Sequence, residues 1–264
     1  CIRDRGYPAA YLPVDRSGVL LPETLERFIS DTALLVSVMT ANNETGTIQP
    51  VAELCRIAHA HGALFHTDAV QALGHIPVDV KSLGVDMLSG SAHKFGGPKG
   101  AGFLYVRSGT PLTPYADGGA QERGLRAGTE NVAGAVGMAA ALKKSCAAMP
   151  ETAEKLRHIE RGLLAELHGV DFIRNGAPDG IPGNMSLSFR GAEGEMLLHR
   201  LDLMGICVST GSACDSARTQ ISHVLEAMGV PEEYAAGTIR VSFGAGNSPE
   251  DGKLVGQAIR KIIG

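Results

Sequence analysis

The sequence lacks the features of a membrane, secreted or nucleic-acid-binding protein. No apolar run approaches the length of a membrane span, and the first residues contain neither the basic nor the apolar region of a signal peptide. Basic tracts are absent and the formal net charge is −4, which argues against direct binding of nucleic acid. We therefore predict a cytoplasmic protein with no membrane partner.

The usual signatures of disulfide, metal and nucleotide sites are also missing. The five cysteines are odd in number, widely spread and without a CxxC pair, so neither a disulfide framework nor a zinc site is predicted. Four histidines between residues 59 and 75 match no zinc motif. A P-loop is excluded because Gly100 follows Lys99, where Ser or Thr would have to bind magnesium.

The composition that remains is that of an ordinary α/β protein. The chain has 264 residues, 44% hydrophobic and 20% charged, which is enough for a large core and for two domains. It begins at Cys1 and enters a stretch, 7–14, that we interpret as an interior strand. We therefore expect the sequence to be a piece of a longer protein.

In the first half of the chain, strand patterns alternate with helix patterns. Short apolar runs at 33–39, 63–67, 85–89 and 102–106 are typical of buried parallel strands, and 22–30 and 51–61 are amphipathic. This rhythm predicts a mostly parallel sheet covered by helices. A further helix is predicted over 131–147, with small apolar residues suited to burial.

A break at Met149-Pro150 is predicted to end the first domain. Residues 1–149 would form part of a large α/β domain and residues 150–264 a small α+β domain. The small domain would contain strands at 170–174, 185–189, 206–208 and 239–243, with helices at 151–167, 193–204 and 250–263.

Polar residues follow three successive strands of the predicted sheet. Asn43, Asp68 with Gln71, and Lys94 come after the first three runs, and ligands of parallel sheets collect at this edge. A carboxylate at a buried strand end needs a cation, although Asp68 could instead cap the following helix.

Lys94 is the residue around which the other candidates can be arranged. It lies between a β-rich run and the stretch Gly96-Gly97-Pro98, which predicts a tight turn at a strand end. Partial desolvation there would lower the pKa of the lysine and favour an imine-forming amine, whereas a solvated turn lysine is the alternative.

Three other features complete the candidate set. The glycine-rich stretch 118–131 contains Thr129 before a helix, which fits either an anion site or a surface loop. Cys214 stands among small residues and is interpreted as exposed, whereas Cys55, Cys146 and Cys207 fit packing. Arg240, inside an apolar strand, would need an anionic partner if buried.

Taken in order, these motifs resemble those of the cysteine desulfurases of the NifS/IscS type. The ordered set is Asn-Asn-Glu-x-Gly, His-x-Asp-Ala-x-Gln, Ser-x-His-Lys-x-x-Gly-Pro-Lys-Gly, Gly-Gly-x-Gln-Glu-x-Gly-x-Arg-x-Gly-Thr and Ser-x-Gly-Ser-Ala-Cys. The similarity covers essentially the whole chain. It implies the fold type I of pyridoxal-phosphate (PLP) enzymes, which is aspartate aminotransferase-like, and a homodimer with shared sites.

The resemblance also implies a role for each candidate residue. Lys94 would hold PLP, Asp68 would pair with its pyridine nitrogen, and Gln71 and Asn43 would lie near its ring oxygen and the substrate. Ser91 and His93 would bind its phosphate, and Thr129 the phosphate held by the partner subunit. Arg240 would bind the carboxylate of L-cysteine.

Cys214 would take the sulfur of L-cysteine as a persulfide, with L-alanine as the other product. The acceptor would be an iron-sulfur scaffold or a tRNA thiolation enzyme, and a mobile loop would let the thiolate move between sites. Members of the family carry an earlier segment, with a Gly-x-Thr-Glu-type phosphate turn and a ring-stacking histidine, that this sequence does not contain.

Two alternatives stay open at this point. One is another PLP lyase or aminotransferase of the same fold, which would need Lys94 and Asp68 but not Cys214. The other is a non-catalytic fragment that only dimerises or binds a sulfur acceptor.

Overall fold

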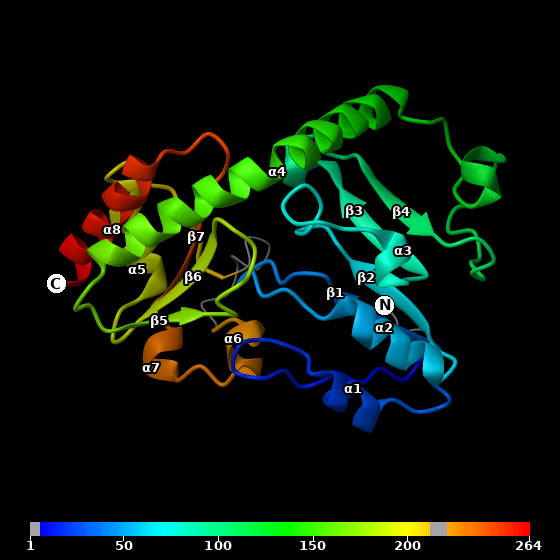
Figure 1. Ribbon diagram of the computed structural model, residues 1–264, viewed down its shortest axis with the longest axis horizontal. Helices are drawn as coiled ribbons and strands as arrows, with labels where there is room; N and C mark the ends of the chain where they lie inside the picture. The colour runs from blue at the N-terminus through cyan, green and yellow to red at the C-terminus, as the bar shows by residue number, and fades with distance from the viewer. Residues whose placement is uncertain (1–5, 212–220) are drawn as a thin grey trace.

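The computed structural model describes residues 6–211 and 221–264, which form two sheets linked by one long helix (Figure 1). The first sheet has the order β1-β2-β3-β4 and the second the order β5-β6-β7. The two hydrophobic cores follow the same division, because one is built around the first sheet and the other around the second.

In the first sheet, three of the four strands run parallel. The strands are β1 (Leu35–Met39), β2 (Leu64–Asp68), β3 (Met87–Ser91) and β4 (Gly102–Val106). β1 pairs with β2 and β2 with β3 in parallel, but β4 is antiparallel to β3. The prediction of a mostly parallel sheet is confirmed. The run at 102–106, which resembled a parallel strand, is antiparallel because a short turn connects β4 to β3 and leaves no room for a crossover helix.

The helices of this half cover the sheet through apolar faces. α2 (Val51–Ala60) buries Leu54 and Ile57 against the core that contains Phe65 of β2. α1 (Pro22–Phe28) begins with proline in its first turn, where the missing N–H costs nothing. The short α3 (Val80–Leu83), which the sequence pattern did not reveal, is capped by the side chain of Asp79.

The turn between β3 and β4 has the tight form that its glycines predicted. It contains the 3₁₀ helix η2 (Ala92–Phe95), which ends at Gly96 with a φ of 82°, a conformation that glycine adopts without strain. The N–H of Ala92 donates to the carbonyl of Ala101 at 3.0 Å, so the two ends of the turn are held together.

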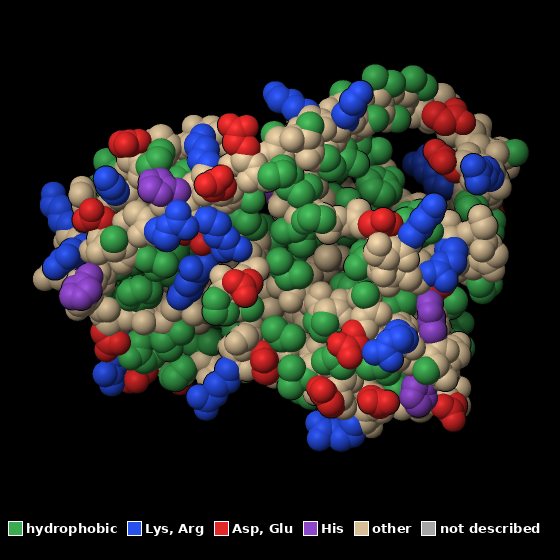
Figure 2. Space-filling model, in the orientation of Figure 1, with side chains coloured by type: hydrophobic (Ala, Val, Ile, Leu, Met, Phe, Trp, Pro, Cys, Tyr) green, Lys and Arg blue, Asp and Glu red, His purple; other side chains and the backbone are tan. Residues whose placement is uncertain are grey.

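Beyond β4, residues 107–131 form an arm that stands clear of the sheet and contains the 3₁₀ helix η3 (Gln121–Gly124) (Figures 1 and 2). Glu122 and Arg123 in this arm have φ angles of 49° and 58°. Such values are uncommon for residues other than glycine.

The arm leads into α4 (Val132–Glu166), which runs through Pro150 without ending. The prediction that the helix breaks at Met149-Pro150 was wrong, because packing of α4 against α8 offsets the lost hydrogen bond and the ring clash that proline causes inside a helix. The later half of α4 also packs against α8 (Pro249–Ile263). The division into residues 1–149 and 150–264 stays a prediction, with the boundary now inside a helix.

The first half of α4 packs against the core of the first sheet through Met138, Ala141 and Leu142, but its other face is exposed, contrary to the sequence prediction. Val132 and Val136 are 66% and 64% exposed, and Ala139 and Ala140 are exposed as well. Among the described helices, only α4 is long and apolar enough to cross a membrane by length and composition, with a mean hydropathy of 1.2 in its best window. Such a single helix is weak evidence for a membrane span, and the packing of its later half against α8 supports a different role.

The second sheet is antiparallel and lies beside α8. Its strands are β5 (Phe172–Asn175), β6 (Asn184–Phe189) and β7 (Thr238–Ser242), and its helices include α5 (Gly194–Asp202), α6 (His223–Ala227) and α7 (Glu232–Ala235). α8 begins with a capping box between Ser248 and Asp251. Its buried face, which includes Val255 and Ile259, closes the core over β6.

Two predicted strands are absent from the described residues. Residues 7–14 have no regular structure, and 206–208 forms no strand. In the second case Ser209 makes an isolated antiparallel bridge with Arg240 of β7, so the chain meets the sheet at a single pair only.

Candidate functional site

The three predicted strand ends meet at one edge of the first sheet. In the parallel register, Met39 lies opposite Asp68 and Asp68 lies opposite Ser89. The loops that carry Asn43, Asp68 and Lys94 therefore leave the sheet at the same edge. This placement of the candidates, which the sequence predicted, is confirmed by the strand register.

Asp68 is held at this edge by its backbone. Its carbonyl accepts the N–H of Thr40 at 2.7 Å, and the next residue, Ala69, donates to the carbonyl of Ser89 at 3.0 Å. One carboxylate oxygen accepts the N–H of Val70 at 2.9 Å. Asp68 is not a helix cap, which was the alternative considered for it, because turns and not a helix follow β2 directly. The side chain is half-buried and therefore still accessible to a ligand.

Ser91 and His93 lie together on the turn that contains Lys94. The hydroxyl of Ser91 is 2.8 Å from Nδ1 of His93, so a hydroxyl and an imidazole point to one place. Lys94 is exposed, with its carbonyl 3.0 Å from Nε2 of His75. The desolvation that we expected for this lysine is thus not provided by the described residues.

His66 adds a polar chain across the face of the sheet. Its Nδ1 is 2.8 Å from the hydroxyl of Ser37 and its Nε2 is 2.9 Å from that of Ser89. Burial lowers the pKa of His66, and the nearby Asp68 carboxylate opposes this effect. The lowered pKa favours the neutral imidazole, which lies between serine hydroxyls of the two neighbouring strands.

The second sheet contributes Arg240, which lies against the loop after β1. Its guanidinium donates to the carbonyl of Asn43 at 3.2 Å and is only half-buried. Its backbone bridges Ser209, with N–H donors in both directions at 2.6 Å and 3.1 Å. No carboxylate forms an ion pair with Arg240 in the described part of the chain, so the rest of its donor fork is available to an anion.

The remaining candidates are less well placed by the geometry. Gln71 is half-buried near the start of the turn after β2, and Thr129 is exposed just before α4. Cys214 lies outside the described residues. Its neighbours Gly211 and Ser222 are described, and both lie near the loop after β1.

The sequence analysis gave no role to Glu44, although this residue belongs to a quoted motif. Its side chain is only 4% exposed, and its carboxylate accepts the hydroxyl of Ser222 at 2.6 Å. An acidic residue in a polar loop is usually solvated. The only signal that could have marked it was its place between Asn43 and Thr45.

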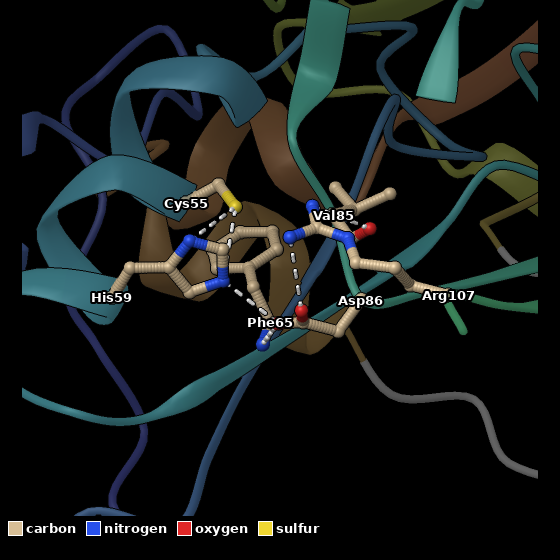
Figure 3. A network of polar contacts seen from close by, with 6 residues as sticks. All are labelled: Cys55, His59, Phe65, Val85, Asp86 and Arg107. Atoms are coloured by element: carbon tan, nitrogen blue, oxygen red, sulfur yellow. Dashed lines mark hydrogen bonds and ion pairs between the residues drawn. The ribbon is translucent and has the colours of Figure 1, made fainter. Parts of the chain in front are cut away.

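A second polar cluster lies at the far end of β3 (Figure 3). Asp86 accepts from Nε2 of His59 at 2.8 Å and from the N–H of Phe65 at 2.8 Å, while Arg107 approaches it at 3.5 Å. Sγ of Cys55 is 3.7 Å from Nε2 of His59. The order Cys, His, Asp has the appearance of a nucleophile with its base.

The electrostatics of this cluster argue against that role. Burial, and then the charge of Asp86, raise the pKa of the Cys55 thiol to about 11, against the opposing charge of Arg107. A thiol with this pKa is not a nucleophile at neutral pH. We assign the cluster to structure, and note that Cys146 and Cys207, which we expected to pack, are in fact exposed.

Comparison with known proteins places the chain in a family. Residues 2–255 match the model of the aminotransferase class-V family. A protein of Clostridium botulinum strain Hall named cysteine desulfurase IscS is 46% identical over 99% of this chain and 67% of its own length.

The chain belongs to the cysteine desulfurase family.

Solved structures of similar proteins agree with this result. A NifS-like protein superposes with a TM-score of 0.90 at 40% identity, over 99% of this chain and 69% of its own. A structure described as SspA in complex with cysteine has a TM-score of 0.78 at 30% identity, over 92% and 68%. The fold predicted from the motifs, that of fold type I enzymes, is confirmed, and the chain spans about two thirds of the length of these relatives.

Proposed function

We propose that this protein is a PLP-dependent cysteine desulfurase that removes sulfur from L-cysteine, releases L-alanine and keeps the sulfur as a persulfide on Cys214. The observation that carries the proposal is the meeting of Asp68, the Ser91–His93 pair and Lys94 at one sheet edge. Relatives named cysteine desulfurase IscS, from Clostridium botulinum, Dictyoglomus turgidum and Methanosarcina thermophila, support the same chemistry.

The donor set at the sheet edge fits PLP. Asp68 offers a carboxylate to the pyridine nitrogen, and the hydrogen-bonded pair of the Ser91 hydroxyl and the His93 imidazole offers polar groups to a phosphate from one place. The amine of Lys94 is exposed on the same turn, and Gln71 and Asn43 flank the edge. When bound, PLP accepts the electron pair that is released on a substrate carbon.

Arg240 is proposed to hold the carboxylate of L-cysteine. One arm of its guanidinium is fixed by the carbonyl of Asn43, which orients the remaining donors without neutralising their charge. A guanidinium held in this way binds a carboxylate through two parallel hydrogen bonds. The substrate would thus lie between Arg240 of the second sheet and the edge of the first.

The proposed role of Cys214 is to accept the sulfur. Its thiolate forms a bond to the sulfur of the substrate while the carbon–sulfur bond breaks. The electron pair of that bond stays on the carbon, which takes the proton of the substrate thiol and becomes the methyl group of alanine. The products are L-alanine and a persulfide anion, so atoms and charge balance without an added oxidant.

The experiment that tests this proposal uses Lys94→Ala, with Lys99→Ala as a matched control on the same exposed turn. In the native protein supplied with PLP, we expect Lys94→Ala to remove the visible absorbance of bound cofactor and all release of alanine. Lys99→Ala should keep both. Failure of the wild type to bind PLP would favour a non-catalytic fragment that only dimerises or binds a sulfur acceptor.

A companion variant separates the desulfurase from other PLP lyases and aminotransferases. We expect Cys214→Ala to retain the absorbance and to lose alanine release, whereas Cys146→Ala, at an exposed cysteine of α4, should retain both. Sulfide and alanine release that survives Cys214→Ala would contradict the persulfide route.

The partners of the reaction are also proposals. We propose that the persulfide is passed to an iron-sulfur scaffold or a tRNA thiolation enzyme in the cytoplasm. A homodimer is proposed as well, because Thr129 is exposed just before the apolar half of α4, where it could serve the phosphate of a second copy.

A further inference from the structure

Two side chains from different elements bind the backbone of the turn that carries Lys94. Nε2 of His75, in the stretch after β2, is 3.0 Å from the carbonyl oxygen of Lys94. Because a carbonyl oxygen can only accept, Nε2 of His75 is the donor. The hydroxyl of Ser145, from α4, donates to the carbonyl of Phe95 at 3.0 Å. The last two carbonyls of η2, which a helix leaves without partners of its own, are thus both held from outside the turn.

Glycines allow the three segments to meet closely. The φ of Gly74 is 79°, and an added Cβ there would lie 2.9 Å from Cβ of Phe95 and 3.0 Å from Cβ of Ser145. Such contacts are too short, so a side chain at this position would push one of the neighbours away. An added Cβ at Gly137 of α4 would lie 3.4 Å from the ring of Pro98, just after η2. The turn is therefore packed between the stretch after β2 and α4.

His75 is joined to Asp68 by a short stretch of chain with its own hydrogen bonds. The N–H of His75 donates to the carbonyl of Ala72 at 3.0 Å, and the N–H of Ala72 to that of Ala69 at 2.9 Å. Both alanines are fully buried, so the imidazole keeps a fixed place relative to the Asp68 carboxylate. Because the peptide group is planar, a fixed carbonyl of Lys94 also fixes the backbone angle that directs its side chain.

We propose that His75 and Ser145 are positioning residues for Lys94, which hold the backbone of its turn so that its amine faces a cofactor at the sheet edge. This role rests on the proposed function of Lys94. Each of the two side chains acts through a backbone carbonyl and not on the reacting amine.

The alternative, that the two side chains only close the turn, does not account for their contacts. The turn is already closed by its own backbone, because the N–H groups of Gly96 and Gly97 donate to the carbonyl of Ala92. The N–H of Ala92 in turn donates to the carbonyl of Ala101. The two side chains therefore add a fixed orientation, relative to β2 and α4, to a turn that is already formed.

The experiment examines the native protein first without and then with PLP. In the cofactor-free protein, we expect His75→Ala to speed hydrogen exchange of the Gly96 and Gly97 amides by about tenfold. After PLP is added, the absorbance of bound cofactor should appear about tenfold more slowly than in the wild type, since a small misplacement of a reacting group is costly. His75→Gln, whose side-chain amide can donate from the place of Nε2, should restore most of both rates. Ser145→Ala should change both rates in the same direction as His75→Ala.

His61→Ala provides the matched control, because His61 pairs with Asp31 before β2, at the opposite end of the sheet. It should keep both rates of the wild type. The inference is overturned if His75→Ala exchanges these amides and takes up PLP as fast as the wild type, or if His75→Gln is no better than His75→Ala. A wild type that takes up no PLP would instead overturn the proposed function, while the exchange rates would still test the hold of His75 on the turn.

Discussion

At the scale of single residues, buried carboxylates determine how this protein responds to acid. The Asp86 side chain is 8% exposed and is surrounded by donors from α2, β2 and the residue after β4. Burial acts to raise the pKa of Asp86, but hydrogen bonds from His59 and Phe65 and the charge of Arg107 outweigh it. The net pKa lies below the ordinary value of a carboxyl group.

We expect this lowered pKa to make Asp86 a source of acid sensitivity. Because the unfolded chain binds a proton to this group near pH 4 and the folded chain only below that, the stability from Asp86 is present above about pH 4 and is lost as the pH falls further. Asp86→Asn should lower the free energy of unfolding at pH 7 by about 1–3 kcal/mol. The same variant should also lose less stability than the wild type as the pH falls from 5 to 3.

Urea denaturation across this pH range measures both effects. Asp117→Asn, at an exposed residue of the arm, should keep the stability and acid response of the wild type. If the free energy of unfolding falls with pH equally steeply in Asp86→Asn and wild type, Asp86 is not a source of acid sensitivity.

Single residues also show the limits of sequence reasoning. Asp68 and Lys94 were predicted to share one sheet edge because the carboxyl ends of neighbouring parallel strands lie together. The order of strands along the sequence is enough for that prediction. The burial of Glu44 was not predicted because its partner, Ser222, is 178 residues away, and no local pattern reports such a contact.

At the scale of elements, α4 connects the two halves of the molecule and has a buried charge in its second half. Glu160 is 3% exposed, and its carboxylate accepts from Arg174 at 2.9 Å, from Arg157 at 3.3 Å and from the N–H of Gly183 at 2.6 Å. These partners come from β5, α4 itself and the residue before β6. The cluster thus joins the helix to the second sheet.

We expect Glu160→Ala to lower the free energy of unfolding by about 2–4 kcal/mol, because it leaves the buried N–H of Gly183 and two guanidinium groups without their acceptor. Glu154→Ala, on the exposed side of the same helix, should change it by less than about 0.5 kcal/mol. Chemical denaturation followed by circular dichroism gives both values. Equal stabilities for the two variants would show that the cluster does not stabilise the fold.

The bounds of helices and strands were predicted well where a local sequence pattern determines them. They were predicted poorly where packing against a distant element determines them. The strand over 102–106 was found with its bounds, but its direction was wrong, since direction depends on the connection. Pro150 was interpreted as a break because the sequence does not show that α8 packs against the later half of α4.

At the scale of the whole molecule, the chain presents an apolar surface that a folded monomer would not need. Val132 and Val136 lie one helical turn apart on α4, and both are about two-thirds exposed. The neighbouring alanines leave room for close approach of another surface. In Figure 2 this half of α4 stands at the rim of the molecule beside the arm.

We expect this surface to be buried between two copies of the protein. Sedimentation velocity should show a dimer for the wild type and a smaller species for Val132→Lys combined with Val136→Lys, because two charges cannot be buried there without partners. Leu203→Lys, at an exposed residue after α5, should remain dimeric. A wild type that sediments as a monomer at all concentrations would contradict the dimer.

The turn between β3 and β4 affects the order in which parts of the protein fold. Its ends are tied by Ala92 and Ala101, so closing it costs little chain entropy compared with joining β1 to β2 across a helix. We expect the backbone around Lys94 to adopt its native conformation early in folding. The contacts of Arg240, which join segments far apart in the sequence, should form later. In newly synthesised chains, the turn that is proposed to hold the cofactor would then form before the proposed substrate site around Arg240.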